Sequence, residues 1–521
     1  MAHRRHVSHV RSRPLGLSRP VMSNTIDGYV GDVSYAPRYH RACAPSWLHF
    51  VATALARRAP DPSQPYRWCE LGCGPAYGAA VLAAANPHAV FHAIDANADH
   101  VRAGQAWVER ADLRNLTVER STFAELAARA NDHVAPFDYI VLTGVYAWVS
   151  PANQAAVRDF VSRYLKPGGI VHVAYPCLPG MAAMMPLRNL FRDYAASARG
   201  DASARAAHAL VQVRALGHGG AAFFDAHPAL LQGLDAADAH HLGDFAHDYL
   251  AQHWQPQHVG DVVRAFEEAG CHWVGSAQPA ENIDAVCLPA AAVSQVQAIE
   301  QADLRESARA FCMNQALRND IYQRTGPDQH LTPAAHRGAL LAQRLFGVTT
   351  TSAHDRARRI VEDPTYEVLR GRLSQGALSF AQAAQHAHYA SQPGALNPAF
   401  QLLAGAGIAL PVLTQPPDPL PAQAFNRAVA QAVLQGALLD TLAAPALGAG
   451  VAATLPQMAA LLALHDRPDA SGDALIDHAW TMVRRHGAED LPARHGQAFA
   501  NALADIHSHV LPAWRQLGVL A

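Results

Sequence analysis

Short apolar runs alternate with longer amphipathic segments between Tyr66 and Tyr175. The short runs are rich in β-branched and aromatic residues, whereas the longer segments repeat their apolar residues at helical spacing. This alternation is typical of a parallel sheet whose two faces are covered by helices. The sequence therefore predicts a doubly wound, Rossmann-like α/β fold. The five predicted strands are residues 67–71, 90–95, 116–120, 139–142 and 170–175.

Helical spacing prevails after the fifth predicted strand and predicts a helical insertion at residues 181–257. A predicted helix at residues 259–269 follows, and then two short apolar runs at residues 271–276 and 285–288. We expect both runs to be strands that complete the core sheet on the far side of the insertion. The resulting core segments, the first of which includes an N-terminal lid, are residues 27–180 and 258–289.

The two ends of the chain differ from this core in composition. Helical spacing dominates to the C-terminus, and the proline-rich segment 415–421 is the best linker candidate. It separates a helical middle region, residues 290–414, from a C-terminal domain, residues 422–521. Residues 1–26 contain five arginines, no acidic residue and no apolar stretch. They predict a disordered basic leader rather than a secretory signal.

Composition narrows the classes of function. The 521 residues are 50% hydrophobic and carry a formal net charge of -2, so neither nucleic acid nor an anionic membrane surface is an expected partner. No run of about 18 apolar residues occurs, and we expect no membrane insertion. Seven scattered cysteines favour a reducing cytoplasm, and the 30 histidines lack metal-ligand spacing. The expectation is a cytoplasmic protein without a metal, whose oligomeric state, a homodimer included, stays open.

The clearest chemical motif is the segment 70–78, Glu-Leu-Gly-Cys-Gly-Pro-Ala-Tyr-Gly, which follows a predicted strand and opens a helix. Its glycines let a cofactor approach the backbone closely. NAD-binding turns place the third glycine three positions after the second, whereas Gly78 comes four positions after Gly74. The acidic Glu70 suits the positive amino group and sulfonium of S-adenosylmethionine better than a phosphate. A tight turn without a ligand is the alternative. The candidate cofactor residues here are Glu70, Gly72, Cys73, Gly74 and Gly78.

The ends of the second and third predicted strands supply further candidates. Asp95, followed by Ala96, lies 21 residues after Gly74, where a carboxylate can accept two hydrogen bonds from ribose hydroxyls. After the third strand, Ser121, Thr122 and Phe123 stand where methyltransferases often have an acidic residue for the adenine amino group. Their hydroxyls and ring can hold the adenine, although a loop without a ligand is an equal alternative.

The end of the fourth predicted strand borders the reacting methyl group in this kind of fold. Thr143 and Gly144 are candidate cofactor residues there. Tyr146 and Trp148 can flank a sulfonium through cation–π contacts or orient an acceptor amine, with Tyr146 favoured of the two. Aromatic residues at strand ends also serve simply as packing, and that interpretation stays open.

Together these motifs resemble class I methyltransferases. The glycine turn, Asp95, the strand at residues 137–142 and the Leu-Lys-Pro-Gly-Gly segment at 165–169 carry the resemblance. Residues 29–277 are further similar to bacterial methyltransferases with a methyltransferase regulatory domain, a group that includes lysine methyltransferases of surface proteins. The segments that carry this second resemblance are residues 35–37, 44–48, 144–149, 247–250, 253–256 and 259–277.

The resemblance implies roles for segments outside the nucleotide turn. In such relatives the insertion caps the active site and the C-terminal domains help to choose the substrate. His247, Asp248, Tyr249 and Trp254 are then expected near the cofactor, although packing of a helix end explains them equally well. Relatives often have a histidine at the position of Thr143, so no base is assigned there. The candidate catalytic residues are Tyr29, Tyr35 and Tyr146, which would orient an amine, and Asp248, which would act as a base.

The leading hypothesis is an enzyme that uses S-adenosylmethionine to methylate lysine side chains of a protein. The long helical C-terminal half favours a macromolecular acceptor. A small-molecule N- or O-methyltransferase is the alternative. Because of Thr143 and Ser121, a regulatory protein that binds the cofactor without turnover remains an alternative hypothesis. Because of the glycine turn, a nicotinamide oxidoreductase is a further alternative.

Overall fold

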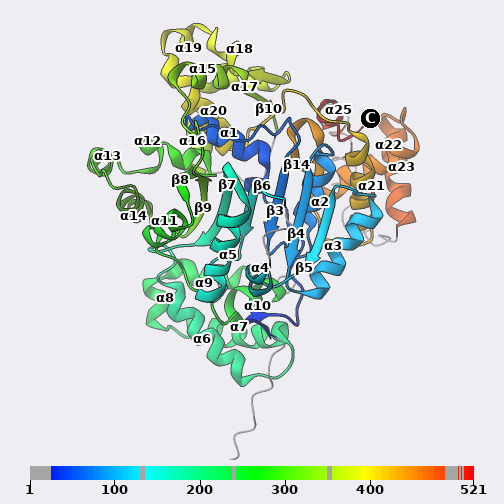
Figure 1. The fold of residues 1–521 in the computed structure, drawn as a ribbon. Helices are drawn as coiled ribbons and strands as arrows, with labels where there is room; N and C mark the ends of the chain where they lie inside the picture. The colour runs from blue at the N-terminus through cyan, green and yellow to red at the C-terminus, as the bar shows by residue number, and fades with distance from the viewer. Residues whose placement is uncertain are drawn as a thin grey trace, which may run out of the picture.

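A seven-stranded mixed sheet lies at the centre of the protein (Figure 1). The computed structural model describes residues 25–129, 135–237, 242–348, 355–486, 503, 506 and 510–520. The strand order is β5-β4-β3-β6-β7-β9-β8, and the first five of these strands run parallel. Three of the five predicted strands have the predicted bounds, and the other two are longer. The five strands are β3 (Arg67–Leu71), β4 (Val90–Asp95), β5 (Leu116–Arg120), β6 (Phe137–Thr143) and β7 (Leu165–Pro176).

The predicted strand at residues 285–288 is wrong, because this run belongs to the short helix α12 (Asp284–Cys287). The sheet is completed by β8 (Cys271–Ser276) and by β9 (Leu317–Arg324), which lies antiparallel between β7 and β8. A four-residue apolar run fits a buried helical turn as well as a strand. The core therefore extends to residue 324 instead of 289.

Helices cover both faces of the sheet, as the alternation of buried residues along each strand requires. On β3, Trp68 faces one hydrophobic core and Cys69 faces the other. The helices on the Trp68 side are α1 (Pro45–Ala54), α2 (Tyr77–Ala85) and α3 (Ala98–Arg110). Those on the Cys69 side include α4 (Phe123–Ala128), α5 (Pro151–Tyr164) and α11 (Val259–Glu268). This is the expected doubly wound arrangement.

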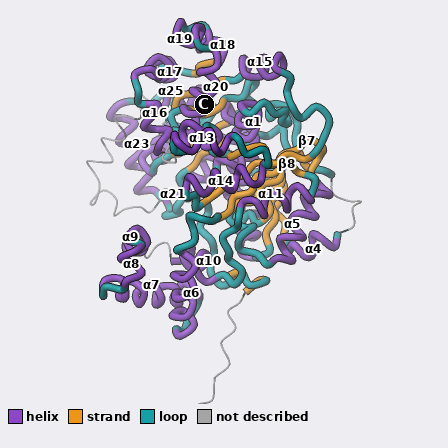
Figure 2. Tube along the Cα trace, turned by 90° about the vertical axis from the view of Figure 1, so that its left-hand side faces the viewer, coloured by secondary structure: helices purple, strands orange, loops and turns teal. Residues whose placement is uncertain are grey.

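The helical insertion predicted between the fifth and sixth strands is present. Its helices build a small hydrophobic core of their own, centred on Phe191 and Leu210. The insertion lies at the lower end of the molecule in Figures 1 and 2, opposite the helices of residues 333–342 and 367–391. Its helices are α6 (Met184–Ser197), α7 (Ala202–His218), α8 (Ala222–Ala226), α9 (Pro228–Asp235) and α10 (Leu242–Leu250).

The region after β8 contains more strands than expected. A three-stranded sheet, β11-β10-β12, and the hairpin β13–β14 interrupt the helices. Each of these strands has only three or four residues, too few to establish an alternating pattern in the sequence. The strands are β10 (Arg344–Gly347), β11 (Ala377–Ser379), β12 (Ala409–Pro411), β13 (Thr441–Ala444) and β14 (Ala449–Ala452). The helices of the region are α13 (Ala290–Gln297), α14 (Ala302–Met313), α15 (Pro333–Ala342), α16 (Asp355–Val361), α17 (Glu367–Leu373), α18 (Phe380–Ala384), α19 (Ala387–Ser391), α20 (Leu396–Gly405), α21 (Leu420–Leu434), α22 (Leu455–Asp466), α23 (Gly472–Arg485) and α25 (Leu511–Leu517).

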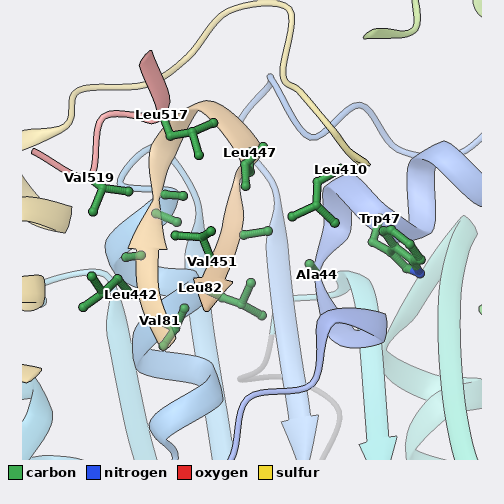
Figure 3. Packing of buried hydrophobic residues seen from close by; sticks show 14 of the residues in the cluster. Ala44, Trp47, Val81, Leu82, Leu410, Leu442, Leu447, Val451, Leu517 and Val519 are labelled. Atoms are coloured by element: carbon green, nitrogen blue, oxygen red, sulfur yellow. The ribbon is translucent and has the colours of Figure 1, made fainter. Parts of the chain in front are cut away.

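The C-terminal part packs directly on the core helix α2. Figure 3 shows Val81 and Leu82 of α2 beside Leu442 and Val451 of the β13–β14 hairpin. The proline-rich segment predicted as a linker forms a loop only to Pro419, after which α21 begins. Hydrophobic residues on both sides of this loop belong to the same core, so the loop joins two parts that share a single packed interior.

The predicted N-terminal leader lies outside the described residues, apart from its last two. Those two residues form β1 (Thr25–Ile26), which pairs with β2 (Tyr29–Val30) in a small hairpin. Among the described residues, no helix has the length and apolar character needed to cross a bilayer.

Candidate functional site

A cavity opens where β3, β4, β5 and β6 end, the edge of a doubly wound sheet at which ligands bind. The loops that leave these four strands form its floor and sides, and the N-terminal residues 26–40 form the opposite wall. All of the predicted cofactor residues line this cavity, so the structure brings them together. They are Glu70, Gly72, Cys73, Gly74, Gly78, Asp95, Ala96, Ser121, Thr122, Phe123, Thr143 and Gly144.

The glycine turn needs its glycines for two different reasons. Gly72 has a φ of 75° and Gly74 a φ of 54°, in the left-handed region that side chains other than glycine rarely adopt. A Cβ at Gly72 would also collide with Val145, whereas one at Gly74 would have no protein atom within 4 Å. Gly72 therefore permits close packing of the turn, and Gly74 leaves open space on the cavity side.

Asp95 holds this turn in place. Its Oδ2 accepts a hydrogen bond from the Gly74 amide at 2.9 Å, and its Oδ1 accepts one from the Asn97 amide at 2.8 Å. The Nδ1 atom of His100 lies 3.2 Å from Oδ1 of Asp95. On the other side of the ring, Nε2 accepts a hydrogen bond from the Tyr35 amide, also at 3.2 Å. Because Nε2 is the acceptor, the proton resides on Nδ1 and points to Asp95. His100 thus joins the cofactor turn to the N-terminal wall, a role that its sequence position did not reveal.

Glu70 is a buried carboxyl group at the floor of the cavity. Burial, and secondly the charge of Asp95, raises the pKa of Glu70 to about 8. Two acidic groups that face the same space favour a positively charged ligand, since a cation restores the ionised form of Glu70. The site therefore fits the amino group and sulfonium of S-adenosylmethionine.

The N-terminal wall is held by the last helix of the insertion. Asp244 of α10 accepts a hydrogen bond from the Ala36 amide at 3.2 Å and forms an ion pair with Arg38. The ring of His247 stacks on Tyr29 at 5.0 Å and meets the edge of Tyr35 at 5.3 Å. The insertion thus reaches the cavity through these lid residues, while His247 and Asp244 do not line it.

Three of the four catalytic candidates lie in this part of the molecule. Tyr29 and Tyr35 line the cavity. Burial raises the pKa of both hydroxyls, that of Tyr35 to about 12, so both keep their protons at neutral pH. Asp248 lies behind them rather than in the lining, and its charge adds to the rise at both tyrosines. Burial, and secondly Asp244, raises the pKa of Asp248 to about 6.

The prediction that Tyr146 faces the reacting groups is wrong, because Tyr146 does not line the cavity. Its side chain is buried against Phe266, and its hydroxyl accepts a hydrogen bond from Arg158 at 2.7 Å. The chain turns after Gly144, so Tyr146 points into the core beneath the site and Trp148 lines the cavity instead. The wall residues that the sequence did not single out include Arg38, His40, Asn97, Val145, Val149 and Asn153.

Tyr249 and Trp254 also lie outside the cofactor cavity. Tyr249 stacks on Phe245 at 4.2 Å within the core of the insertion. Trp254 is buried below Arg188, whose guanidinium carbon lies 5.1 Å from the centre of the ring. For these two residues, packing of the helix end and of the loop after it is the interpretation that the structure supports. Among the described residues, no group of three or more histidine, cysteine or acidic side chains could hold a metal ion.

Two family models match the chain, one over the cofactor cavity and one over the segment that begins at the lid contact of Asp244. Residues 69–171 match a methyltransferase domain, which contains the glycine turn and Asp95. The protein is an S-adenosylmethionine-dependent methyltransferase. Residues 244–324 match a predicted methyltransferase regulatory domain, from the lid contact at Asp244 to the end of β9. This match includes only the last helix of the insertion, so the regulatory domain and the insertion are not the same segment.

Relatives and solved structures extend the likeness over most of the chain. An uncharacterised protein of Synechocystis sp. is 25% identical over 506 residues, which cover 95% of this chain and 99% of the relative. The structure of PKMT2 from Rickettsia typhi is similar with a TM-score of 0.65 and 15% identity, over 92% of this chain and 98% of that one. The structure of PKMT2 from Rickettsia typhi in complex with AdoHcy is similar with a TM-score of 0.62 and 16% identity, over 88% of this chain and 98% of that one.

Binding of S-adenosylmethionine is expected to release close to one proton from Glu70 at pH 7. With a pKa of about 8 the carboxyl is mostly protonated at that pH, whereas a bound cation favours the ionised form. Affinity should therefore rise as the pH increases from 6 towards 8, by up to about tenfold per pH unit. Calorimetry in two buffers of different ionisation enthalpy measures the proton release. Glu70→Gln should bind weakly without releasing a proton, and an undiminished release in that variant would contradict the role of Glu70.

Replacement of Asp244 by alanine tests whether α10 positions the lid. The change removes the bond to the Ala36 amide and the pair with Arg38, two residues of the cavity wall, whereas Asp244 itself does not line the cavity. We expect a loss of about 1 kcal/mol, which is about a fivefold rise in the dissociation constant of S-adenosylmethionine. Calorimetry measures it. Asp159→Ala, which removes an equal charge from the exposed pair with Arg163 on α5, is the control. Equal affinities of the two variants would show that the lid does not depend on Asp244.

Proposed function

We propose that the protein transfers the methyl group of S-adenosylmethionine to lysine side chains of a protein. The observation that carries the proposal is the pair of protonated tyrosines, Tyr29 and Tyr35, in the cavity wall opposite the cofactor turn, with the charge of Asp248 close enough to raise the pKa of both hydroxyls. Hydroxyls and a carboxylate can orient an ammonium group and accept its proton. The likeness to PKMT2 of Rickettsia typhi, a protein lysine methyltransferase, adds support over nearly the full chain.

The cofactor residues receive these proposed roles. Glu70 faces the positive groups, and Asp95 accepts hydrogen bonds from the ribose hydroxyls. Residues 121–123 hold the adenine with two hydroxyls and the Phe123 ring. The remaining residues shape the walls by their small size or their main chain. They are Gly72, Cys73, Gly74, Gly78, Ala96, Thr143 and Gly144.

The chain's own residues must prepare the acceptor amine. The bound cofactor supplies a methyl group on an electron-poor sulfur. A lysine ammonium has an ordinary pKa of about 10.4, so it must lose a proton before its lone pair is available. Tyr29 and Tyr35 orient the nitrogen through their hydroxyl oxygens, and Asp248 takes up the proton that Tyr35 relays. Asp248 can do so because its pKa of about 6 leaves it mostly ionised at neutral pH.

Transfer of a radioactive methyl group from the cofactor to a cell lysate tests the function. The lysate is separated into protein and small-molecule fractions, and labelled proteins are digested and mapped by mass spectrometry. We expect the label on lysine side chains in the protein fraction. Label confined to small molecules would contradict the proposal and favour a small-molecule N- or O-methyltransferase.

Tyr35→Phe is expected to lower kcat about tenfold in the same assay, because one hydroxyl that orients the amine is lost. The dissociation constant of the cofactor should change less than twofold. Tyr249→Phe is the matched control, because Tyr249 lies in the core of the insertion and outside the cavity. Equal kcat values for the two variants would remove Tyr35 from the reaction.

A further inference from the structure

A second cavity of about 390 Å³ adjoins the first. Its lining comes from the start of α5, from Leu178 after β7 and from the loop 252–258 that leads into α11. Val149 lines both cavities, so the two spaces meet at this side chain. A ligand in the second cavity therefore lies beside the part of the first cavity that is bordered by Trp148.

The loop that forms this cavity is fixed at three places. Main-chain amides of the loop donate hydrogen bonds to the carbonyls of Gly28 in the lid at 2.7 Å, Ala147 after β6 at 2.9 Å and Pro176 at the end of β7 at 2.9 Å. Arg188 also donates to the carbonyl of Ala251, and its guanidinium lies over the Trp254 ring. A cavity with such anchored walls is formed before a ligand arrives, which lowers the entropic cost of binding.

Neutral amides dominate the chemistry of the second cavity. Four glutamines and two histidines, His253 and His258, line it. A side-chain amide has two N–H donors and a carbonyl acceptor, and two of the four glutamines use one N–H on a main-chain carbonyl, of Tyr146 and of Gln255. The carboxylate of Asp261, which also lines it, is paired with Arg264. This lining suits a ligand that is polar, uncharged and equipped with both donors and acceptors. The four glutamines are Gln154, Gln252, Gln255 and Gln257.

An extended peptide main chain has this chemistry, because its carbonyl and N–H groups alternate along the strand. We propose that the second cavity binds the main chain of the acceptor protein next to the methylated lysine, an inference that rests on the proposed function. The long lysine side chain then passes Val149 and reaches Tyr29 and Tyr35 in the first cavity. Selection of a protein acceptor over free lysine follows from contacts that only a flanking main chain can make.

The double variant Gln252→Ala/Gln255→Ala tests this inference. Both side chains are exposed, and the anchoring bonds of these two residues come from their main chain, so the fold should be retained. The acceptors are a pool of 11-residue peptides with one central lysine and, for comparison, a single-lysine compound without peptide groups, free lysine. Gln232→Ala/Gln375→Ala, two exposed glutamines outside both cavities, is the control.

We expect the KM of the peptide pool to rise about tenfold in the double variant, with the turnover of the single-lysine compound and the cofactor dissociation constant unchanged. Fluorescence polarisation of the labelled pool measures peptide binding independently of methyl transfer, and it should show the same loss. Equal binding of the pool to the double variant and the control, or no binding to the unaltered protein, would overturn the inference. Absence of methyl transfer to any protein in the lysate would contradict the proposed function instead.

Discussion

Asp95→Ala is expected to raise the dissociation constant of S-adenosylmethionine about tenfold to a hundredfold. A charge-assisted hydrogen bond contributes roughly 1.5 to 3 kcal/mol, and the proposed bonds to the ribose are of this kind. The structure adds a second cause, because the same carboxylate accepts the amides of Gly74 and Asn97 and faces His100. Loss of Asp95 removes a contact to the ligand and also loosens the turn and the lid that surround it.

Calorimetric titration with S-adenosylmethionine and with S-adenosylhomocysteine measures this effect. Asp95→Asn separates the two causes, since an asparagine oxygen can still accept the Gly74 amide while the carboxylate charge is lost. Its affinity should lie between those of the alanine variant and the unaltered protein. Asp112→Ala, which removes an exposed acid paired with Arg114, is the control. An unchanged affinity of Asp95→Ala would remove Asp95 from the cofactor site.

Arg318→Met is expected to cost about 3 to 5 kcal/mol of the free energy of unfolding, the largest effect on stability anticipated here. The guanidinium is only 2% exposed and bonds to Asp320 at 2.8 to 3.0 Å, Glu306 at 2.9 Å and Gln315 at 3.0 Å. Methionine fills the volume but leaves the buried Asp320 without its cation, while Glu306 keeps only its pair with Arg309 at 3.2 Å. Tyr175 still donates to Asp320 and offsets part of the cost.

Arg114→Met provides the matched control for stability. Arg114 also pairs with an aspartate, but its side chain is 86% exposed, and exposed pairs contribute little to stability. Urea and thermal unfolding, followed by circular dichroism, compare the two variants. A midpoint for Arg318→Met as high as that of Arg114→Met would show that the buried network does not stabilise the sheet. The cofactor affinity of the folded protein should stay close to normal, because Arg318 does not line the cavity.

The buried network also explains why β9 was missed in the sequence. The strand reads Leu-Arg-Asn-Asp-Ile-Tyr-Gln-Arg, a polar pattern that does not indicate a central strand. Arg318 and Asp320 can lie inside the sheet because they bond to each other and because Arg318 also bonds to Glu306 from α14. Propensity and periodicity describe neighbours along the chain, whereas Glu306 and Tyr175 reach this pair from 12 and 145 residues away.

The glycine turn and Asp95 could be recognised from the sequence because both are local features. A strand, a turn of glycines in fixed spacing and an acid at the end of the next strand are set by residues close together in the chain. The parallel sheet then brings these strand ends to one edge, as the fold class requires. The sequence alone therefore indicated S-adenosylmethionine as the methyl donor, without knowledge of any tertiary contact.

The acceptor side of the site was decided by tertiary structure. Asp244 meets Ala36 and Arg38 across more than 200 residues of sequence. The turn after Gly144 directs Tyr146 into the core and Trp148 to the cavity. The spacing of residues in the sequence does not specify the direction in which the backbone turns.

The sequence by itself thus determined the doubly wound core and the cofactor turn, because local periodicity and glycine spacing carry that information. Only the folded chain decided which tyrosines line the cavity, how β9 buries its charges and where the second cavity lies. These features depend on pairs of distant residues that satisfy each other's charge and hydrogen bonds, and such pairs exist only once the chain has folded.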